Sequence, residues 1–241
     1  MNPPMDEREA RVELAAAFRL AVMFDFHEGI SNHFSMLIPG REDRFLINSF
    51  GLHFSEITAS SLAVVNIDGT VISGRAPDTG VGIHSPIHRL CSQAQVVLHT
   101  HQPWSTALAM QDELHLVPIS QTSLQFDGRI AYDEEYHGLA DLNEGERLAK
   151  ALGQHDVMLL RHHGVLVAGA ELGSAFDDLY MLEKAAQLQV LASGLGALTP
   201  IDAQVIADTR GEMVGGLAGW GRLHWEALLR MVERTQPDFR D

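Results

Sequence analysis

Residues 95–102 place two histidines on one apolar stretch that is predicted to be a β-strand. The run reads Gln-Val-Val-Leu-His-Thr-His-Gln, and valine and leucine there favour extended backbone. Side chains of a strand alternate between its two faces, so Val97, His99 and His101 should project from the same face. This spacing puts two imidazole nitrogens within reach of one ion.

A third candidate ligand lies in residues 156–169, where an apolar strand ends in His162-His163-Gly164 and a second strand begins. Two histidines on one strand and one at a strand end match the ligand count of a catalytic zinc-type site, which keeps a position open for water or substrate. A His-x-His pair alone is weak evidence, because the chain has 13 histidines and most histidines are surface or core residues. The metal site is therefore a hypothesis that other features must support.

Composition excludes several classes of partner. The chain has 17 Lys and Arg residues against 32 Asp and Glu residues, which gives a net charge of -15. This charge argues against binding to nucleic acid or to an anionic membrane. A length of 241 residues with 46% hydrophobic content allows a proper core. We expect one domain that spans residues 1–241.

Three features favour a soluble cytoplasmic protein. The single cysteine, Cys91, excludes a disulfide framework. Asp6, Glu7 and Glu9 near the N-terminus do not fit a signal peptide. No apolar run is long enough to span a bilayer.

Hydrophobic periodicity predicts strands mixed with helices and then a helical C-terminal part. Asp6 and Glu9 form a capping-box pattern for a first helix that runs to about Phe24. Further elements follow in order: antiparallel pairs within residues 34–49 and 62–73, a loop over 75–82, a helix over 83–91, a strand over 114–119, and helices over 143–152, 171–191, 201–209 and 217–234. This order predicts an α/β or α+β domain in which helices cover a sheet.

The predicted helix over residues 83–91 carries His84 and His88 four residues apart on one face. Such a pair could bind a metal. However, no acidic residue lies inside the pair as in the zincin pattern, and helix histidines beside a site more often orient a ligand than bind the metal. We therefore expect this pair to lie outside the ligand set.

Five segments, taken in order and spacing, resemble the class II aldolase/adducin family, and the resemblance runs from about Ala10 to Leu191. The segments are Gly29-Ile-Ser-Asn-His-Phe-Ser35, Ile47-Asn-Ser-Phe-Gly-Leu52, Ile83-His-Ser-Pro-Ile-His88, Val97-Leu-His-Thr-His101 and His162-His-Gly164. The resemblance implies an α/β fold in three layers, with a mostly antiparallel sheet between helices. It also implies a homotetramer with active sites shared between neighbouring subunits, a small-molecule substrate, and a divalent metal. Zinc is the first expectation and manganese the second, with the ligands His99, His101 and His163.

The sequence departs from the sugar-phosphate members of that family at two places. Those aldolases and epimerases carry an acidic residue three positions after a proline, whereas this chain has Gly80 after Pro77. The usual fourth ligand and proton-transfer carboxylate is therefore missing. Their phosphate-binding loops use small hydroxyl residues, whereas Phe50 and Asp78 occupy two such positions here. The departures resemble a bacterial branch nearer to adducin heads and disfavour a phosphosugar substrate.

Two residues are candidates for moving protons at this site. The family uses a tyrosine contributed across the subunit interface, and the matching segment, residues 128–132, ends in Tyr132. An ordinary half-buried tyrosine is the alternative. For the base missing at position 80, the candidates are Glu28 and a metal-bound hydroxide. Glu28 could equally be a plain surface charge.

Four residues are candidates for contacts with the substrate. Asn32 and His33 stand in the loop that the family uses for substrate contacts, although both could simply hydrogen-bond the loop's own backbone. Gly80 and His84 lie where the resemblance places the same site. All four are assigned to substrate binding.

Two classes of function fit these residues. The first is a divalent-metal-dependent lyase, an aldolase or a decarboxylase, which cleaves a carbon–carbon bond of a small unphosphorylated hydroxy or oxo acid through an enolate held on the ion. The second is a non-catalytic, adducin-like oligomerisation domain. The absent carboxylate favours the second class. The three ligand-type histidines favour the first, because aliphatic packing would serve a scaffold at least as well.

Overall fold

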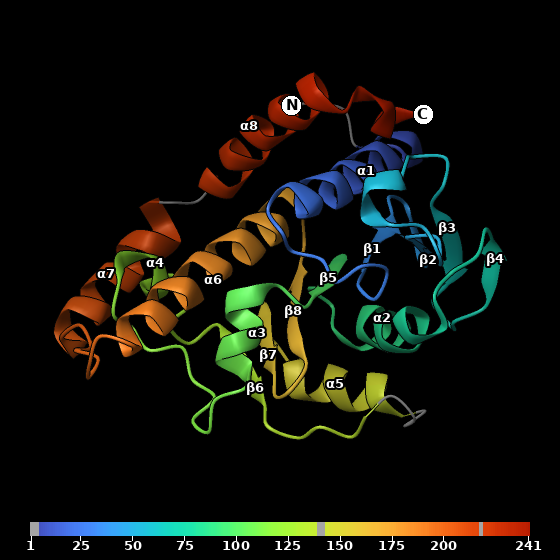
Figure 1. Ribbon diagram of the computed structural model, residues 1–241. Coiled ribbons are helices and arrows are strands. Elements are labelled where there is room, and N and C mark those ends of the chain that lie inside the picture. The colour runs from blue at the N-terminus through green and yellow to red at the C-terminus, as the bar shows by residue number, and fades with distance from the viewer. Residues whose placement is uncertain (1–4, 139–142, 217–218) are drawn as a thin grey trace.

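A mostly antiparallel sheet forms the centre of the computed structural model, which describes residues 5–138, 143–216 and 219–241 (Figure 1). Its eight strands have the order β4-β3-β2-β1-β5-β8-β7-β6. They are β1 (His33–Ile38), β2 (Arg41–Ile47), β3 (Ala63–Asn66), β4 (Val71–Ser73), β5 (Val96–Thr100), β6 (Ile130–Asp133), β7 (Val157–Leu160) and β8 (Gly164–Gly169). Strands β6 and β7 pair in parallel and the other neighbours pair antiparallel. The expected fold class is confirmed.

Helices cover both faces of the sheet. They are α1 (Glu7–Met23), α2 (Asp78–Leu90), α3 (Pro103–Ala109), α4 (Gln121–Leu124), α5 (Glu144–Leu152), α6 (Leu172–Ser193), α7 (Ala203–Gly216) and α8 (Trp220–Thr235), with short 3-10 turns at Phe54–Glu56 and Pro237–Arg240. In Figure 1, α2 and α5 lie along one side of the sheet, and α1, α6 and α8 lie along the other. The buried clusters follow the same division.

The side-chain alternation of β5 fixes which layer each residue meets. Val96 and Leu98 join the apolar cluster beneath α1 and α6, whereas Val97 joins the cluster beneath α2 and α5. All three side chains are fully buried. His99, two residues after Val97, therefore projects toward the α2 layer, because strand side chains repeat with period two. The sheet thus carries the histidine on a rigid, doubly covered strand.

Helix α2 begins at Asp78, so the loop expected over residues 75–82 is wrong for most of its length. Glycine disfavours helix, and Gly80 and Gly82 therefore favour a loop on local propensity alone. The structure shows why a glycine is used: a Cβ at Gly80 would lie 3.0 Å from Cγ of His33 on β1. Tertiary packing of α2 on the sheet outweighs the local propensity.

The strand expected over residues 114–119 is also wrong, because this segment joins no sheet in the described part of the chain. Its side chains Leu114 and Leu116 are buried, as the apolar pattern suggested. However, its backbone donors bond to side chains rather than to a strand. The Leu116 N–H donates to the Tyr132 hydroxyl at 3.3 Å, and the Val117 N–H donates to Gln189 on α6 at 2.7 Å.

Most of the other predicted helices are confirmed with shifted ends. The capping box of Asp6 and Glu9 begins α1. The helix predicted over residues 217–234 corresponds to α8, and residues 217 and 218 lie outside the described part of the chain. Among the described residues, none of the helices has both the length and the apolar character that crossing a bilayer requires.

Helices α2 and α5 approach each other closely at two glycines. A Cβ built on Gly145 of α5 would overlap the carbonyl oxygen of Gly82 on α2 and lie 2.8 Å from Cγ of Pro86. A Cβ on Gly82 itself would meet no atom within 4 Å. The contact therefore tolerates a side chain on α2 but not on α5.

The Gly145→Ala variant should lower the free energy of unfolding by about 1–3 kcal/mol, because the added methyl group must push the two helices apart. The matched Gly82→Ala variant should leave it unchanged or raise it by up to about 1 kcal/mol, because alanine favours helix more than glycine does. Urea unfolding followed by circular dichroism measures both values. Equal stability of the two variants would contradict this packing.

Candidate functional site

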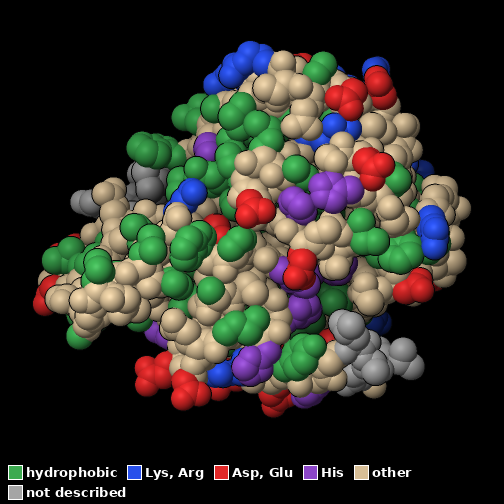
Figure 2. All heavy atoms as spheres, in the orientation of Figure 1, with side chains coloured by type: hydrophobic (Ala, Val, Ile, Leu, Met, Phe, Trp, Pro, Cys, Tyr) green, Lys and Arg blue, Asp and Glu red, His purple; other side chains and the backbone are tan. Residues whose placement is uncertain are grey.

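Three histidines converge beside the end of strand β5. His99, His101 and His163 each offer a ring nitrogen, and these nitrogens all lie within 4.8 Å of one another. The ring centroids are 4.9 Å apart for His99 and His101 and 4.7 Å apart for His99 and His163. Figure 2 shows histidine side chains gathered near the centre of one face, with acidic side chains beside them. The structure thus brings together the three predicted metal ligands.

The turn between β7 and β8 delivers the third histidine. His162 has a φ of 59°, a left-handed conformation that is uncommon outside glycine and allows the chain to reverse directly after β7. At Gly164 a Cβ would overlap the carbonyl oxygen of Thr100 and lie 2.8 Å from Cδ2 of His101. Glycine therefore lets β8 approach the end of β5, and His163 lies against the other two rings.

Hydrogen bonds determine which nitrogen of two rings faces the group. Nδ1 of His99 bonds the Val165 carbonyl at 2.9 Å, and a carbonyl can only accept, so this nitrogen carries the proton. Nδ1 of His101 donates to Oε2 of Glu28 at 2.5 Å. In neutral rings both Nε2 atoms then carry lone pairs, and the two atoms lie 3.1 Å apart. Partners of this kind are typical of metal-binding histidines.

These donors fit a divalent cation. Burial, with a smaller contribution from charge on neighbouring histidines, lowers the pKa of His99 well below its ordinary value. Burial likewise lowers the pKa of His163 to about 4. Neutral imidazoles with converging lone pairs repel one another unless a cation lies between them, and imidazole nitrogen is a preferred ligand of zinc. The chemistry of the donor set therefore agrees with a metal centre.

Glu28 and Asn32 lie together at the edge of this group. The Glu28 carboxylate holds His101, although its side chain is 68% exposed. The Glu28 backbone N–H donates to Oδ1 of Asn32 at 2.6 Å. Nδ2 of Asn32 is buried and has no hydrogen-bond partner within the described residues. Glu28 thus orients a predicted ligand, and Asn32 keeps a free donor beside it.

The three other predicted substrate residues lie on the α2 side of the group. His33 on β1 pairs directly with His99 on β5, and the two ring centroids are 4.9 Å apart. Gly80 provides the space for the His33 ring, as described above. His84 is fully buried behind it and bonds Nδ1 of His33 at 2.7 Å. Any effect of His84 on a ligand must therefore pass through His33.

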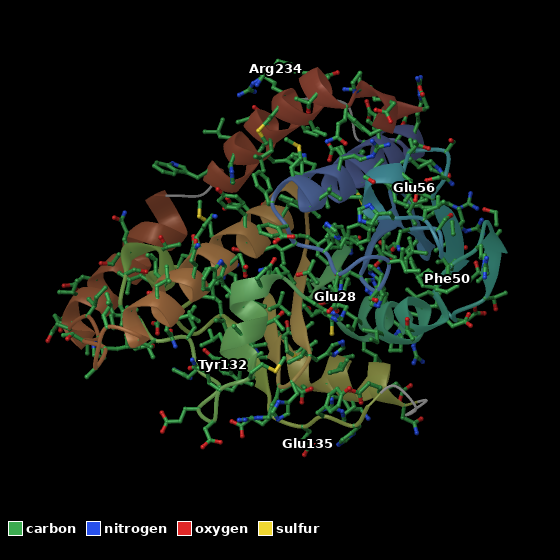
Figure 3. The ribbon with its side chains drawn as sticks, in the orientation of Figure 1. Glu28, Phe50, Glu56, Tyr132, Glu135 and Arg234 are labelled. Carbon is green, nitrogen blue, oxygen red and sulfur yellow. The ribbon has the colours of Figure 1, made fainter. Side chains whose placement is uncertain are left out.

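Tyr132 lies on the opposite face of the sheet within its own chain. It packs against the cluster beneath α1 and α6, whereas its neighbour Ala131 joins the cluster beneath α2 and α5. Its ring stacks on His115 with centroids 4.9 Å apart. In Figure 3, Tyr132 and Glu28 are well separated and belong to different parts of the fold. Contact between Tyr132 and a histidine site requires a second copy of the chain.

The sequence reasoning missed two polar residues near the site, one behind it and one beside it. Ser35 on β1 bonds Nδ1 of His84 at 2.5 Å and Nε2 of His88 at 2.7 Å. The spacing of His84 and His88 was a signal, and their expected place outside the three-histidine group agrees with the structure. Ser35, two residues after His33 on the same strand, could have been found from the period of two. The ring centroid of Tyr136 lies 6.3 Å from that of His163. Tyr136 is in a loop, so no strand or helix periodicity could have predicted its position.

Comparison with known proteins identifies relatives over the whole chain. The model of the class II aldolase and adducin N-terminal domain matches residues 12–190. A Caulobacter vibrioides protein that is provisionally named as a class 2 aldolase is 37% identical, and the match covers 98% of this chain and 93% of that protein. Rat alpha-adducin is 34% identical over 94% of this chain, which spans only 33% of the adducin's length.

Two solved structures resemble the fold closely. An aldolase II superfamily protein from Pseudomonas syringae has a TM-score of 0.91 and 42% identity, with coverage of 100% of this chain and 98% of that one. L-fuculose 1-phosphate aldolase from Glaciozyma antarctica has a TM-score of 0.89 and 28% identity, with coverage of 100% and 97%.

Proposed function

The chain belongs to the class II aldolase and adducin family, and we propose that it is a divalent-metal-dependent lyase that cleaves a carbon–carbon bond. The observation that carries this proposal is the convergence of Nε2 of His99 and Nε2 of His101, which lie 3.1 Å apart, with His163 beside them. The reaction is an aldol cleavage or a decarboxylation. The proposed substrate is a small unphosphorylated hydroxy or oxo acid.

His99, His101 and His163 would hold the metal, with zinc as the first choice and manganese as the second. A bound divalent ion would act as a Lewis acid on the oxygens of the substrate. The three ligands are neutral and no carboxylate stands at Gly80, so the centre favours an anionic, bidentate substrate over a neutral diol.

Residues around the centre would place and deprotonate the substrate. Glu28 keeps the proton of His101 on Nδ1, and its exposed carboxylate can accept a proton from a substrate hydroxyl. The free Nδ2 donor of Asn32 can bond a substrate oxygen. His33 lies beside His99, close enough to contact the same ligand.

Tyr132 would act from a neighbouring subunit. Its position on the opposite face of the sheet separates it from the histidines of its own chain. A homotetramer in which neighbouring copies share active sites would bring the tyrosine to another chain's metal. There its hydroxyl would deliver a proton to the departing carbanion.

The preference against phosphate follows from Phe50 and Gly80. A phosphate dianion needs hydrogen-bond donors or cations, and Phe50 offers none at its position. Its ring is 43% exposed, with the guanidinium carbon of Arg75 4.8 Å from the ring centroid. Arg75 is a cation that a phosphate could use, so sugar phosphates are the critical comparison in any substrate panel.

A non-catalytic, adducin-like assembly domain is the second candidate function. The match to rat alpha-adducin over 94% of the chain and the glycine at position 80 both favour it. A scaffold of this kind needs no ion. Metal binding therefore discriminates between the two candidates.

Protein purified without a chelator should contain about one divalent ion per chain by elemental analysis, as a three-histidine centre would hold. The His99→Ala/His101→Ala double variant should lose this ion. The matched His155→Ala variant alters an exposed histidine outside the centre and should retain it. Metal-free wild-type protein, or full occupancy in the double variant, would refute the metal centre and favour the assembly domain.

Mixing the His99→Ala and Tyr132→Phe variants should restore part of the activity that each has lost. Hybrid oligomers would contain some sites with both residues intact, if the two residues act in trans. The assay compares each variant alone with the mixture after subunit exchange has been verified by mass spectrometry. Absence of rescue despite exchange would count against a shared site.

A panel of 2-oxo acids, hydroxy acids, their aldol adducts and ketose 1-phosphates should identify the substrate class. With zinc or manganese present, release of aldehyde or carbon dioxide should be fastest from the unphosphorylated acids, because the centre favours a bidentate carboxylate. L-fuculose 1-phosphate is the essential comparison, since a related structure carries that activity in its name. If it were the best substrate by a wide margin, the inference from Phe50 and Gly80 would be wrong.

A further inference from the structure

A continuous chain of buried polar groups runs from the three-histidine group into the protein behind it. Nδ1 of His33 bonds Nε2 of His84 at 2.7 Å, and Nδ1 of His84 bonds the Ser35 hydroxyl at 2.5 Å. The same hydroxyl bonds Nε2 of His88 at 2.7 Å, and Nδ1 of His88 bonds the Ala94 carbonyl at 2.7 Å. We call this series the histidine relay.

The carbonyl at the inner end fixes the direction of every bond in the histidine relay. The Ala94 carbonyl can only accept, so Nδ1 of His88 carries the proton of the neutral ring and Nε2 of His88 carries a lone pair. Ser35 has one hydroxyl proton, which it must donate to that lone pair. Its oxygen must then accept from Nδ1 of His84.

The same logic continues outward to the first ring. Nε2 of His84 is a lone pair because its other nitrogen holds the proton, so it accepts from Nδ1 of His33. Nε2 of His33 is then left without a proton. The backbone carbonyl of Ala94 thus sets the tautomer of a ring three hydrogen-bonded groups away.

Burial keeps all three rings neutral, as this assignment requires. His84 is fully buried, and His33 and His88 are 3% and 6% exposed. Loss of hydration lowers the pKa of His88 to about 4 and that of His84 well below its ordinary value. A neutral ring carries one proton, and the location of that proton follows from the hydrogen-bond partners.

The ring of His33 packs beside the three-histidine group. Nδ1 is held on the α2 side by His84, whereas Nε2 makes no hydrogen bond within the described residues. The ring lies beside His99, with the two ring centroids 4.9 Å apart. A Cβ at Gly80 would lie 3.0 Å from Cγ and 3.1 Å from Cδ2 of this ring. Helix α2 therefore carries no side chain at this position, where its backbone approaches the His33 ring.

We propose that the histidine relay holds His33 as the Nδ1–H tautomer. Nε2 of His33 is then a hydrogen-bond acceptor beside the three-histidine group, and it accepts a hydrogen bond from a substrate hydroxyl. His33 is then a specificity residue that selects ligands with a hydroxyl donor. Ser35 and His88 are positioning residues, because they act only through His84 and His33. The hydroxyl contact rests on the proposed function, whereas the tautomer does not.

Long-range proton–nitrogen NMR correlation on protein labelled with nitrogen-15 histidine reads the tautomers directly. His33, His84 and His88 should all appear as Nδ1–H forms, although an isolated histidine prefers Nε2–H. Loss of signals in a His33→Gln variant assigns the first ring. An Nε2–H tautomer for His33 in the wild-type protein would overturn the relay, whatever the protein catalyses.

In Ser35→Ala the tautomers of His84 and His33 should no longer be fixed, because Nδ1 of His84 has lost its acceptor. His84 can then hold its proton on Nε2 and donate it to Nδ1 of His33. The His33 signals should shift toward the Nε2–H form. Ser85→Ala is the matched control: it removes a hydroxyl from α2 that bonds the Ile67 carbonyl outside the relay, and it should leave the His33 tautomer unchanged. An unchanged tautomer in folded Ser35→Ala protein would refute the relay.

Binding of glycolate and methoxyacetate tests the hydroxyl contact without turnover. Glycolate can donate from its hydroxyl, whereas the ether oxygen of methoxyacetate can only accept. In calorimetry on zinc-loaded protein, the preference for glycolate should fall roughly two- to tenfold in Ser35→Ala, as expected for the loss of one hydrogen bond. An equal preference in both proteins would exclude the contact. If neither acid binds, the proposed ligand class fails, and the NMR tautomer still decides the relay.

Discussion

The close approach of strand β8 to strand β5 is the constraint on which the rest of the site depends. At Gly164 no side chain fits, because the Thr100 carbonyl and the His101 ring occupy the space. The approach brings His163 over the rings of His99 and His101. It also places the Val165 carbonyl where it can accept the His99 proton. The absence of a Cβ at Gly164 therefore allows both the position of His163 and the hydrogen bond that sets the tautomer of His99.

Direction of hydrogen bonds is the second organising principle around this centre. Three rings are oriented by a group that can only accept, which is a carbonyl for His99 and His88 and a carboxylate for His101. The tautomers of His84 and His33 then follow from that of His88 through the Ser35 hydroxyl. The Nε2 atoms of His99 and His101 lie next to each other and to His163, whereas Nε2 of His88 accepts from Ser35 in the interior. A neutral acceptor in a buried place needs no counter-ion. The three-histidine group thus offers acceptors that suit a cation.

Sequence periodicity predicted the parts of this structure that depend on a single strand. The period of two placed His99 and His101 on one face, and the apolar strand ending in His163 placed the third donor near a strand end. The start of α2 at Asp78 was not predictable, because Gly80 and Gly82 disfavour helix and the packing of Gly80 against His33 is a long-range contact. Long-range contacts with side chains also determine the conformation of residues 114–119. Their N–H groups bond partners that no local pattern could reveal.

Unsatisfied groups argue for a ligand at this place on grounds independent of family. Nδ2 of Asn32 and Oδ1 of Asn48 are buried without a partner in the described residues, although the Asn48 amide donates to the Asn32 carbonyl. A buried polar group without a hydrogen bond costs about 1–3 kcal/mol, and converging lone pairs on His99 and His101 add repulsion. A domain that served assembly alone would gain stability from apolar side chains at these positions. The proposed ligand, bound beside Glu28, would give the Asn32 donor a partner.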